Sequence, residues 1–216
     1  MKEHGNIQSS LEYFLKFKLP KKAKILDVGC NHGSLIYKIQ KAGYKNVFGI
    51  DINKEAILQG KKSYKTIRNK LKTYNGKKIL FNDNSFDVVL MFDVIEHIPH
   101  VEEFLKKEVY RVLKKGGSFI FQTPNRPINI LWEIINKRSF TKWKKYHCSL
   151  QTMSSLRRIL KKAGFKEIII EENNILTEYN KTKVRKKMGI IGVFVLYLLN
   201  AMPLGLSSNL WGKGEK

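Results

Sequence analysis

Short apolar runs alternate along this chain with segments in which apolar side chains recur every three or four positions. Short runs rich in valine, isoleucine and phenylalanine predict buried strands, whereas the longer spacing predicts amphipathic helices. We expect strands at 25–28, 47–50, 71–74, 88–92, 118–122, 166–170 and 209–213. We expect helices before Pro20, at 34–42, after Asn53, at 101–113 and at 153–163.

Most of the expected strands are apolar on both faces, and helices separate them. Such strands are typical of a parallel sheet that helices cover on both sides. Ligands of these sheets bind beyond the carboxyl ends of the strands. The residues that directly follow each strand are therefore the first candidates for a functional site.

The first strand leads into a glycine-containing turn within the segment ILDVGCNHGSL at 25–35. A dinucleotide-binding turn that starts at Gly29 needs glycine at positions 31 and 34, where this chain has Asn31 and Ser34. The lysine of a phosphate-binding P-loop is absent as well. Gly29 lets the backbone approach a ligand, and asparagine tolerates a left-handed backbone almost as well as glycine.

The pattern Asp27-x-Gly29-x-Asn31-x-Gly33 resembles the first motif of class I S-adenosylmethionine-dependent methyltransferases, D-x-G-x-G-x-G, with asparagine in place of one glycine. The resemblance covers roughly 22–172. It implies an α/β fold with a Rossmann-like, doubly wound, mostly parallel seven-stranded sheet, an antiparallel last strand and a single domain over 1–216. It also implies S-adenosylmethionine as cofactor. The alternative is a structural strand-to-helix turn without a ligand.

Further residues extend this resemblance to the cofactor. Asp51 follows the second strand, and a carboxylate there can accept hydrogen bonds from both ribose hydroxyls, although it can equally cap the next helix. Asn75 falls where the family often has an aspartate near the adenine amino group. The resemblance assigns these residues to the cofactor: Asp27, Gly29, Cys30, Asn31, Gly33, Asp51, Ile52, Asn75 and Phe92.

The strand at 88–92 continues into D-V-I-E-H-I, which resembles the ubiquinone-biosynthesis O-methyltransferase branch of this family. The resemblance places Asp93, Glu96 and His97 beside the transferred methyl group. His97, with Glu96, could take the proton of a substrate hydroxyl. The three residues could instead hold Mg²⁺ or Zn²⁺. A third reading gives Glu96 and His97 only a structural role, as a hydrogen-bonded helix start that shapes the pocket.

The resemblance also implies an acceptor side, formed by the loop after 118–122 and the segment before 153–163. The residues expected there are Asn125, Arg126, Trp143 and His147. The function we predict is O-methylation of a small lipid-like, quinone-like or glycan-like acceptor. One alternative is an RNA or protein methyltransferase, although the N/D-P-P-[FY] signature of amino methylation is absent. The other is a non-catalytic, membrane-associated protein that binds S-adenosylmethionine.

An uncharged stretch of 19 residues at 188–206 follows five cations at 181–187. We expect an apolar helix at 184–206, inserted before the last strand. The favoured placement is the membrane interface, with the lysines on anionic headgroups. A buried or dimer-forming helix is the main alternative. A membrane span is a third, but 19 residues are marginal for one, and Asn200 and Pro203 count against it.

The chain carries 41 lysine and arginine residues against 18 aspartate and glutamate residues, a formal net charge of +23. Only seven of these cations are arginines, and the lysines are spread along the chain, so nucleic acid is disfavoured as a partner. Cys30 and Cys148 do not suggest a disulfide framework, which favours a reducing compartment. We therefore expect a cytoplasmic protein that is peripheral at the inner face of the membrane.

Overall fold

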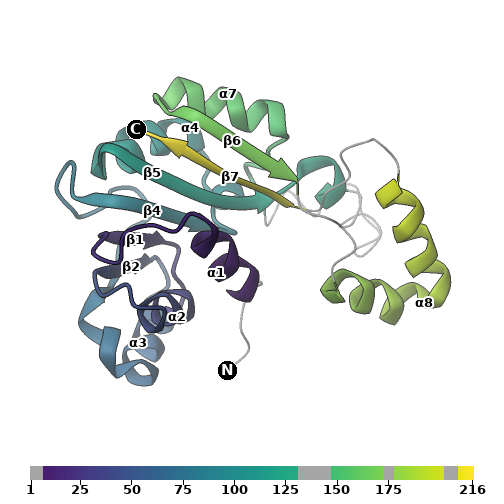
Figure 1. Ribbon diagram of the computed structural model, residues 1–216, viewed down its shortest axis with the longest axis horizontal. Coiled ribbons are helices and arrows are strands. Elements are labelled where there is room, and N and C mark those ends of the chain that lie inside the picture. Colours follow the sequence, from purple (N-terminus) through teal and green to yellow (C-terminus); the bar gives the residue numbers. More distant parts are fainter. Residues whose placement is uncertain (1–6, 131–146, 173–177, 202–208) are drawn as a thin grey trace.

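A seven-stranded sheet forms the centre of the protein (Figure 1). The computed structural model describes residues 7–130, 147–172, 178–201 and 209–216. The strands are β1 (Ile25–Val28), β2 (Val47–Asp51), β3 (Leu71–Thr73), β4 (Phe86–Phe92), β5 (Leu113–Pro124), β6 (Lys166–Glu172) and β7 (Asn209–Glu215). Their order is β3-β2-β1-β4-β5-β7-β6.

The pairing confirms the predicted fold class. The neighbours from β3 to β5 are parallel, whereas β7 runs antiparallel to both β5 and β6. All seven strands lie at the predicted positions, and several are longer than predicted. The largest difference is β5, which covers Leu113–Pro124: it begins five residues earlier than predicted, where Leu113 pairs with Phe86 of β4, and ends two residues later, where it pairs with the start of β7. Apolar patterning does not reveal this extension, because the early residues at 114–117 are two lysines and two glycines and the last residue is a proline.

The helices also follow the sequence pattern. They are α1 (Ile7–Lys16), α2 (Ser34–Lys41), α3 (Lys54–Ser63), α4 (Val101–Phe104), α5 (Tyr110–Val112), α7 (Met153–Ala163) and α8 (Glu178–Ala201), with shorter turns η1 (Lys65–Lys70), η2 (Ile95–His97) and η3 (Leu105–Val109). The helix predicted at 101–113 is continuous through α4, η3 and α5, but its middle turn is the wider π-type. The helix predicted at 184–206 begins earlier and bends at Gly189.

The core has two layers, one on each face of the sheet. Alternate residues of β4 supply both layers: Val89 and Met91 pack under α4, α5 and α7, whereas Val88 and Leu90 pack under α1 and α2. Figure 1 shows these two groups of helices on opposite sides of the strands. A strand with apolar side chains on both faces is stable only when both faces are covered, which is why β4 is so apolar.

The strand order reverses between β1 and β4, whose connections leave the sheet in opposite directions. Carboxyl ends of β1, β2, β4 and β5 therefore lie along one edge, and β7 starts at that edge because it is antiparallel. Crevices at such reversals are where doubly wound sheets bind ligands. The fold brings Gly29, Asp51 and Phe92 to one edge although they are far apart in the sequence.

Helix α3 approaches the loop after β1 so closely that only glycine fits at the contact. A Cβ atom at Gly60 would overlap the backbone carbonyl oxygen of His32. We expect Gly60→Ala to lower the free energy of unfolding by about 1 to 3 kcal/mol, because backbone atoms cannot move aside as a side chain can. Urea unfolding measures this. Gln59→Ala, at the adjacent exposed position, is the control, and equal stability of the two variants would contradict the predicted contact.

Candidate functional site

The turn between β1 and α2 is the first part of the site. Its backbone is left-handed at Gly29, Asn31 and Gly33, with φ angles of 81°, 49° and 84°. Asparagine tolerates this conformation, so the turn keeps its course despite the departure from the family pattern. A Cβ atom at Gly29 would overlap the side chain of Val94, so the turn lies directly against the segment that follows β4.

Asp51 holds this turn in place through both oxygens of its carboxylate. Oδ2 accepts a hydrogen bond from the backbone N–H of Asn31 at 2.7 Å, and Oδ1 accepts one from Asn53 at 2.8 Å. Asn53 then caps α3 by accepting from the backbone N–H of Ala56 at 3.0 Å. The helix-capping role that was open for Asp51 thus belongs to Asn53. Each Asp51 oxygen keeps a lone pair that can accept from a ligand hydroxyl.

Acidic groups gather beneath the turn in this otherwise basic protein. Burial, and then the charge of Asp51, raise the pKa of Asp27 well above its ordinary value. Burial, with Asp27 and Asp51 adding to it, also raises the pKa of the Cys30 thiol. No lysine or arginine forms an ion pair with either aspartate within the ranges that the structure describes. A ligand that brings positive charge would relieve this repulsion.

His32 was not singled out by sequence reasoning, yet it is buried in the same loop. Its Nδ1 lies 3.0 Å from Oδ1 of Asn31, and its Nε2 lies 2.7 Å from the hydroxyl of Ser34. The Tyr64 ring stacks beside it, with centroids 6.2 Å apart. The side chain at position 31 therefore bonds to the imidazole of its neighbour. A lone histidine in a glycine turn carries no sequence signal for such a contact.

The second part of the site follows β4. Asp93 has a left-handed backbone, with φ of 56°, and its N–H donates to the main-chain and side-chain oxygens of Gln122, both at 3.1 Å. The next turn, η2, buries Glu96, whose Oε2 accepts from the hydroxyl of Thr123 at 2.9 Å. The end of β5 thus fixes both acidic residues, which explains why the last residues of β5 stay paired and buried.

An acid–histidine cluster forms where η2 meets the segment that leads to α7. His97 Nε2 lies 3.9 Å from Glu96 Oε1, and the rings of His97 and His147 have centroids 5.2 Å apart. The donor atoms of Glu96, His97 and His147 all lie within 4.8 Å of one another. His147 is held there because the N–H of Ser149 donates to the Glu96 carbonyl at 3.0 Å. Asp93, which was predicted as a third ligand, is not part of this group.

The surroundings of Glu96 and of the nearby Asp93 differ from those of His97, which gives these residues different roles. Burial, and then the charge of Asp93, raise the pKa of Glu96 to about 8. Asp93 is exposed as a residue, but protein atoms crowd its carboxyl group, which raises its pKa as well. Glu96 is therefore mostly protonated at neutral pH. Its neighbour His97 keeps about half of its side chain exposed, so it can reach a bound molecule.

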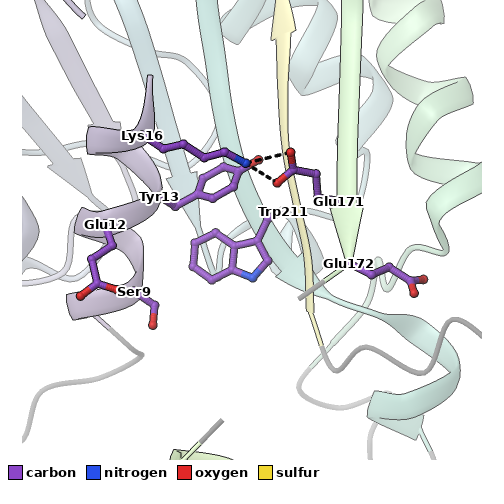
Figure 2. A pocket seen from close by; sticks show the side chains of 7 residues that line it. All are labelled: Ser9, Glu12, Tyr13, Lys16, Glu171, Glu172 and Trp211. Carbon is purple, nitrogen blue, oxygen red and sulfur yellow. Dashed lines mark hydrogen bonds and ion pairs between the residues drawn. The ribbon is translucent and has the colours of Figure 1, made fainter. Parts of the chain in front are cut away.

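A cavity of about 310 Å³ lies between α1 and the ends of β6 and β7 (Figure 2). The rings of Tyr13 and Trp211 face it, with centroids 4.9 Å apart, and Lys16 binds both oxygens of Glu171 at its rim. Phe92 contacts the far side of the Trp211 ring at 5.8 Å between centroids, which joins the cavity to the end of β4. Trp211 Nε1 and the Tyr13 hydroxyl are buried without a hydrogen-bond partner in the described structure.

A family model described as a methyltransferase domain matches residues 2–169, which include every strand from β1 to β5 and the whole glycine turn. The chain belongs to this methyltransferase family. The predicted resemblance is thereby confirmed, and so is the prediction of a methyltransferase. The acidic groups beneath the turn are compatible with this cofactor, because S-adenosylmethionine carries a sulfonium and an ammonium group.

Two relatives illustrate this similarity. Ubiquinone biosynthesis O-methyltransferase of Pelagibacter ubique is 32% identical over 127 residues, which are 57% of this chain and 51% of that protein. Demethylmenaquinone methyltransferase of Lactobacillus johnsonii is 30% identical over 202 residues, 82% of each chain. The methyltransferase described here thus spans about half the length of the first relative and most of the second.

Solved structures agree on the fold. Phosphoethanolamine N-methyltransferase 2 of Haemonchus contortus, in complex with phosphomonomethylethanolamine and S-adenosylhomocysteine, superposes with a TM-score of 0.70. The match covers 97% of this chain and 52% of that one at 16% identity. At this identity the similarity concerns the fold alone.

The structure places the remaining predicted cofactor residues along one edge. Ile52 is exposed directly after Asp51, and Phe92 is half-buried at the end of β4. Asn75 is exposed, and its side-chain oxygen accepts from the N–H groups of Lys77 and Lys78, both at 3.0 Å. Its oxygen thus closes a local turn, and its contact with adenine stays a prediction.

The predicted acceptor residues divide into three groups. His147 joins the acid–histidine cluster, and the sequence did not indicate this contact with Glu96 and His97. Asn125 is buried and bridges to Gln151, whereas Arg126 is exposed and donates its backbone N–H to the carbonyl of Gln151 at 2.9 Å. Trp143 lies outside the described residues. The pairing with Gln151 brings the start of α7 to the end of β5.

Removing one acceptor from the Asp51 carboxylate tests its double role. Asp51→Asn keeps the shape but places an NH₂ group against a backbone N–H, so we expect affinity for S-adenosylhomocysteine to fall at least tenfold. A hydrogen bond to a charged group contributes about 1.5 to 3 kcal/mol, and stability should fall by a similar amount. Calorimetry and urea unfolding measure the two effects. Asp83→Asn, at an exposed aspartate, is the control, and unchanged affinity of Asp51→Asn would refute this role.

The raised pKa of Glu96 predicts a pH dependence of stability. A group whose pKa is higher in the folded state stabilises the fold fully below its ordinary pKa and loses this contribution as the pH rises through the folded value. Stability should therefore fall between about pH 4.5 and about pH 8, by at most about 1.4 kcal/mol per pH unit. Glu96→Gln, which stays neutral, should flatten this slope in urea unfolding. Glu167→Gln, at an exposed position, should leave it unchanged; a wild-type slope in Glu96→Gln would contradict the raised pKa.

Proposed function

We propose that this methyltransferase transfers the methyl group of S-adenosylmethionine to a hydroxyl oxygen of a small lipid-like acceptor, of a quinone-like rather than a glycan-like kind. The observation that carries this proposal is the acid–histidine cluster at the end of β4. Its half-exposed His97 lies beside the edge where the cofactor residues gather. A hydroxyl becomes a good nucleophile only when a base takes its proton, and histidine suits this task at neutral pH.

When bound, the cofactor supplies a methyl group that is already activated on a positively charged sulfur. The chain must then hold the acceptor in line and remove one proton. In the proposed step the imidazole of His97 takes the hydroxyl proton, an oxygen–carbon bond forms, and the carbon–sulfur bond breaks to leave a neutral thioether. Glu96 lies 3.9 Å from this imidazole; because its raised pKa favours the protonated form at neutral pH, we do not assign the proton to it.

The cavity beside Phe92 supports an aromatic acceptor. Its walls include the rings of Tyr13 and Trp211, against which a planar ring can stack. The other lining residues are polar and can form hydrogen bonds with oxygen substituents of such a ring: Ser9, Glu12, Lys16, Glu171 and Glu172. A ring that bears several oxygens, such as a quinol, satisfies both conditions, and the names of two relatives, ubiquinone biosynthesis O-methyltransferase and demethylmenaquinone methyltransferase, favour a quinone-like acceptor over a glycan.

The same cluster supports a second use, which is a metal ion. One carboxylate and two imidazoles, from Glu96, His97 and His147, are a donor set that suits Zn²⁺ better than Mg²⁺. An ion at these residues would lower the pKa of an acceptor hydroxyl, so that no protein base is needed. Activity that is lost with a chelator and restored by zinc would favour this use over a base at His97.

Activity measurements with S-adenosylmethionine labelled on its methyl group test the proposed function. A panel of phenols, catechols and short-chain quinols should yield a methylated product, and His97→Gln should lower kcat by about 10²- to 10⁴-fold while affinity for S-adenosylhomocysteine is unchanged. His100→Gln, at an exposed histidine three residues away, is the matched control. Labelling of RNA or protein instead, or cofactor binding with no product from any class, would refute the proposal.

A further inference from the structure

Helix α8 forms no part of the two-layered core. It lies between β6 and β7, and in Figure 1 it stands beyond the end of the sheet, apart from the helices on either face. Its backbone leaves the helical conformation at Gly189, where φ is 63° and ψ is −154°, so the helix consists of two parts at an angle. The strand residues that flank this helix in the sequence are Glu172, the last of β6, and Asn209, the first of β7. Glu172 pairs with Leu210 and Asn209 pairs with Pro124, both beside the carboxyl edge of the sheet.

The apolar side chains of α8 are exposed. Ile190, Ile191 and Phe194 are 72%, 73% and 63% exposed. Seven of the eleven exposed large apolar side chains in the described structure fall within 188–198, and the other four are scattered over the rest of the surface. Scattered apolar residues are normal, but a contiguous exposed patch marks a surface that binds something.

Positive charge accompanies this apolar stretch. Five cations and no acidic residue occupy 181–187, and Arg185 and Lys186 are exposed. Two contacts join the parts of α8 on either side of the bend. A Cβ atom at Gly192 would overlap the side chain of Val184, so the backbone and this side chain lie close together. The Nζ atom of Lys181 lies 5.6 Å from the ring centroid of Tyr197. Cationic and apolar groups therefore belong to one compact element.

Charge distinguishes between the two occupants that an apolar patch can have. A second copy of this chain would bring two sets of five cations together within a protein of net charge +23, and their repulsion would oppose assembly. A bilayer with anionic headgroups offers the opposite charge beside an apolar interior. The observations therefore favour a membrane surface.

The length of the apolar part decides how it would enter a bilayer. After the bend at Gly189, the described part of the helix, 190–201, is about 18 Å long at 1.5 Å per residue, whereas the hydrocarbon core is about 30 Å thick. Within the described ranges, none of the helices combines the length and apolar character that a transmembrane passage requires. The element is suited to lying in the interface, where an apolar face reaches only the outer part of the acyl chains.

We propose that α8 is a membrane-binding element, in which 188–198 enters the interface of an anionic bilayer while the cations of 181–187 contact its headgroups. Because α8 is connected through Glu172 and Asn209, it would hold the carboxyl edge of the sheet close to the lipid surface. A lipid-like acceptor could then reach the site without crossing water. The binding itself does not depend on methyl transfer, so the proposed function can fail while this inference stands.

Vesicle flotation with the full chain tests the apolar contribution. We expect binding to phosphatidylcholine vesicles that contain phosphatidylglycerol, and a partition coefficient at least tenfold lower for the double variant Ile190→Ser/Phe194→Ser. Leu80→Ser is the matched control, because Leu80 is 68% exposed and lies outside α8. Thermal unfolding and affinity for S-adenosylhomocysteine, unchanged in all variants, show that the fold is intact.

The electrostatic contribution has its own test. Arg185→Gln/Lys186→Gln should lower the partition coefficient severalfold on anionic vesicles, with little change on pure phosphatidylcholine, and added salt should remove the difference. Lys61→Gln/Lys62→Gln, two exposed lysines of α3, is the control. The inference is overturned if wild-type protein does not float. It is also overturned if Ile190→Ser/Phe194→Ser floats equally well, or if sedimentation shows a dimer that this variant dissociates.

Discussion

The site depends on one carboxylate. Asp51 binds the backbone of the turn after β1 with one oxygen and the start of α3 with the other. Three left-handed residues in a five-residue turn would otherwise be poorly determined, because each is a conformation that the unfolded chain rarely favours. By fixing the turn, Asp51 fixes a backbone surface at the edge where doubly wound sheets bind ligands, and it does so from the neighbouring strand.

Charge gives this arrangement its chemical direction. The protein as a whole is strongly basic, yet the turn gathers Asp27, Asp51 and a buried thiol, and burial, with repulsion among these groups adding to it, raises the pKa values of Asp27 and Cys30. Buried like charges are stable only if something offsets them. S-adenosylmethionine, which carries positive charge, would do so on binding, and buried groups with raised pKa values are typical of functional sites.

At the other end of the site, the acid–histidine cluster is assembled from three segments. Glu96 and His97 come from the turn after β4, Thr123 from the end of β5, and His147 from the segment before α7. The buried Glu96 is the common partner, because its side chain accepts from Thr123 and its carbonyl accepts from Ser149. This cluster and the cavity beside Trp211 lie near the edge of the sheet from which α8 extends. A lipid-like acceptor that arrives from the side of α8 would therefore be close to both.

The sequence by itself determined the fold class, the methyltransferase family and the approximate positions of all seven strands, because these follow from local periodicity and from glycines and acids at fixed spacing. It also indicated Glu96 and His97. Only the tertiary structure decided that Asp51 clamps the turn, that His147 rather than Asp93 joins the cluster, that His32 bonds to Asn31, and that the apolar part of α8 is exposed. Most of these are contacts, or the absence of contacts, between elements distant in the sequence, whereas the bond between the adjacent residues His32 and Asn31 depends on the left-handed course of their own turn. Periodicity shows which residues are apolar, but packing alone shows which of them are covered.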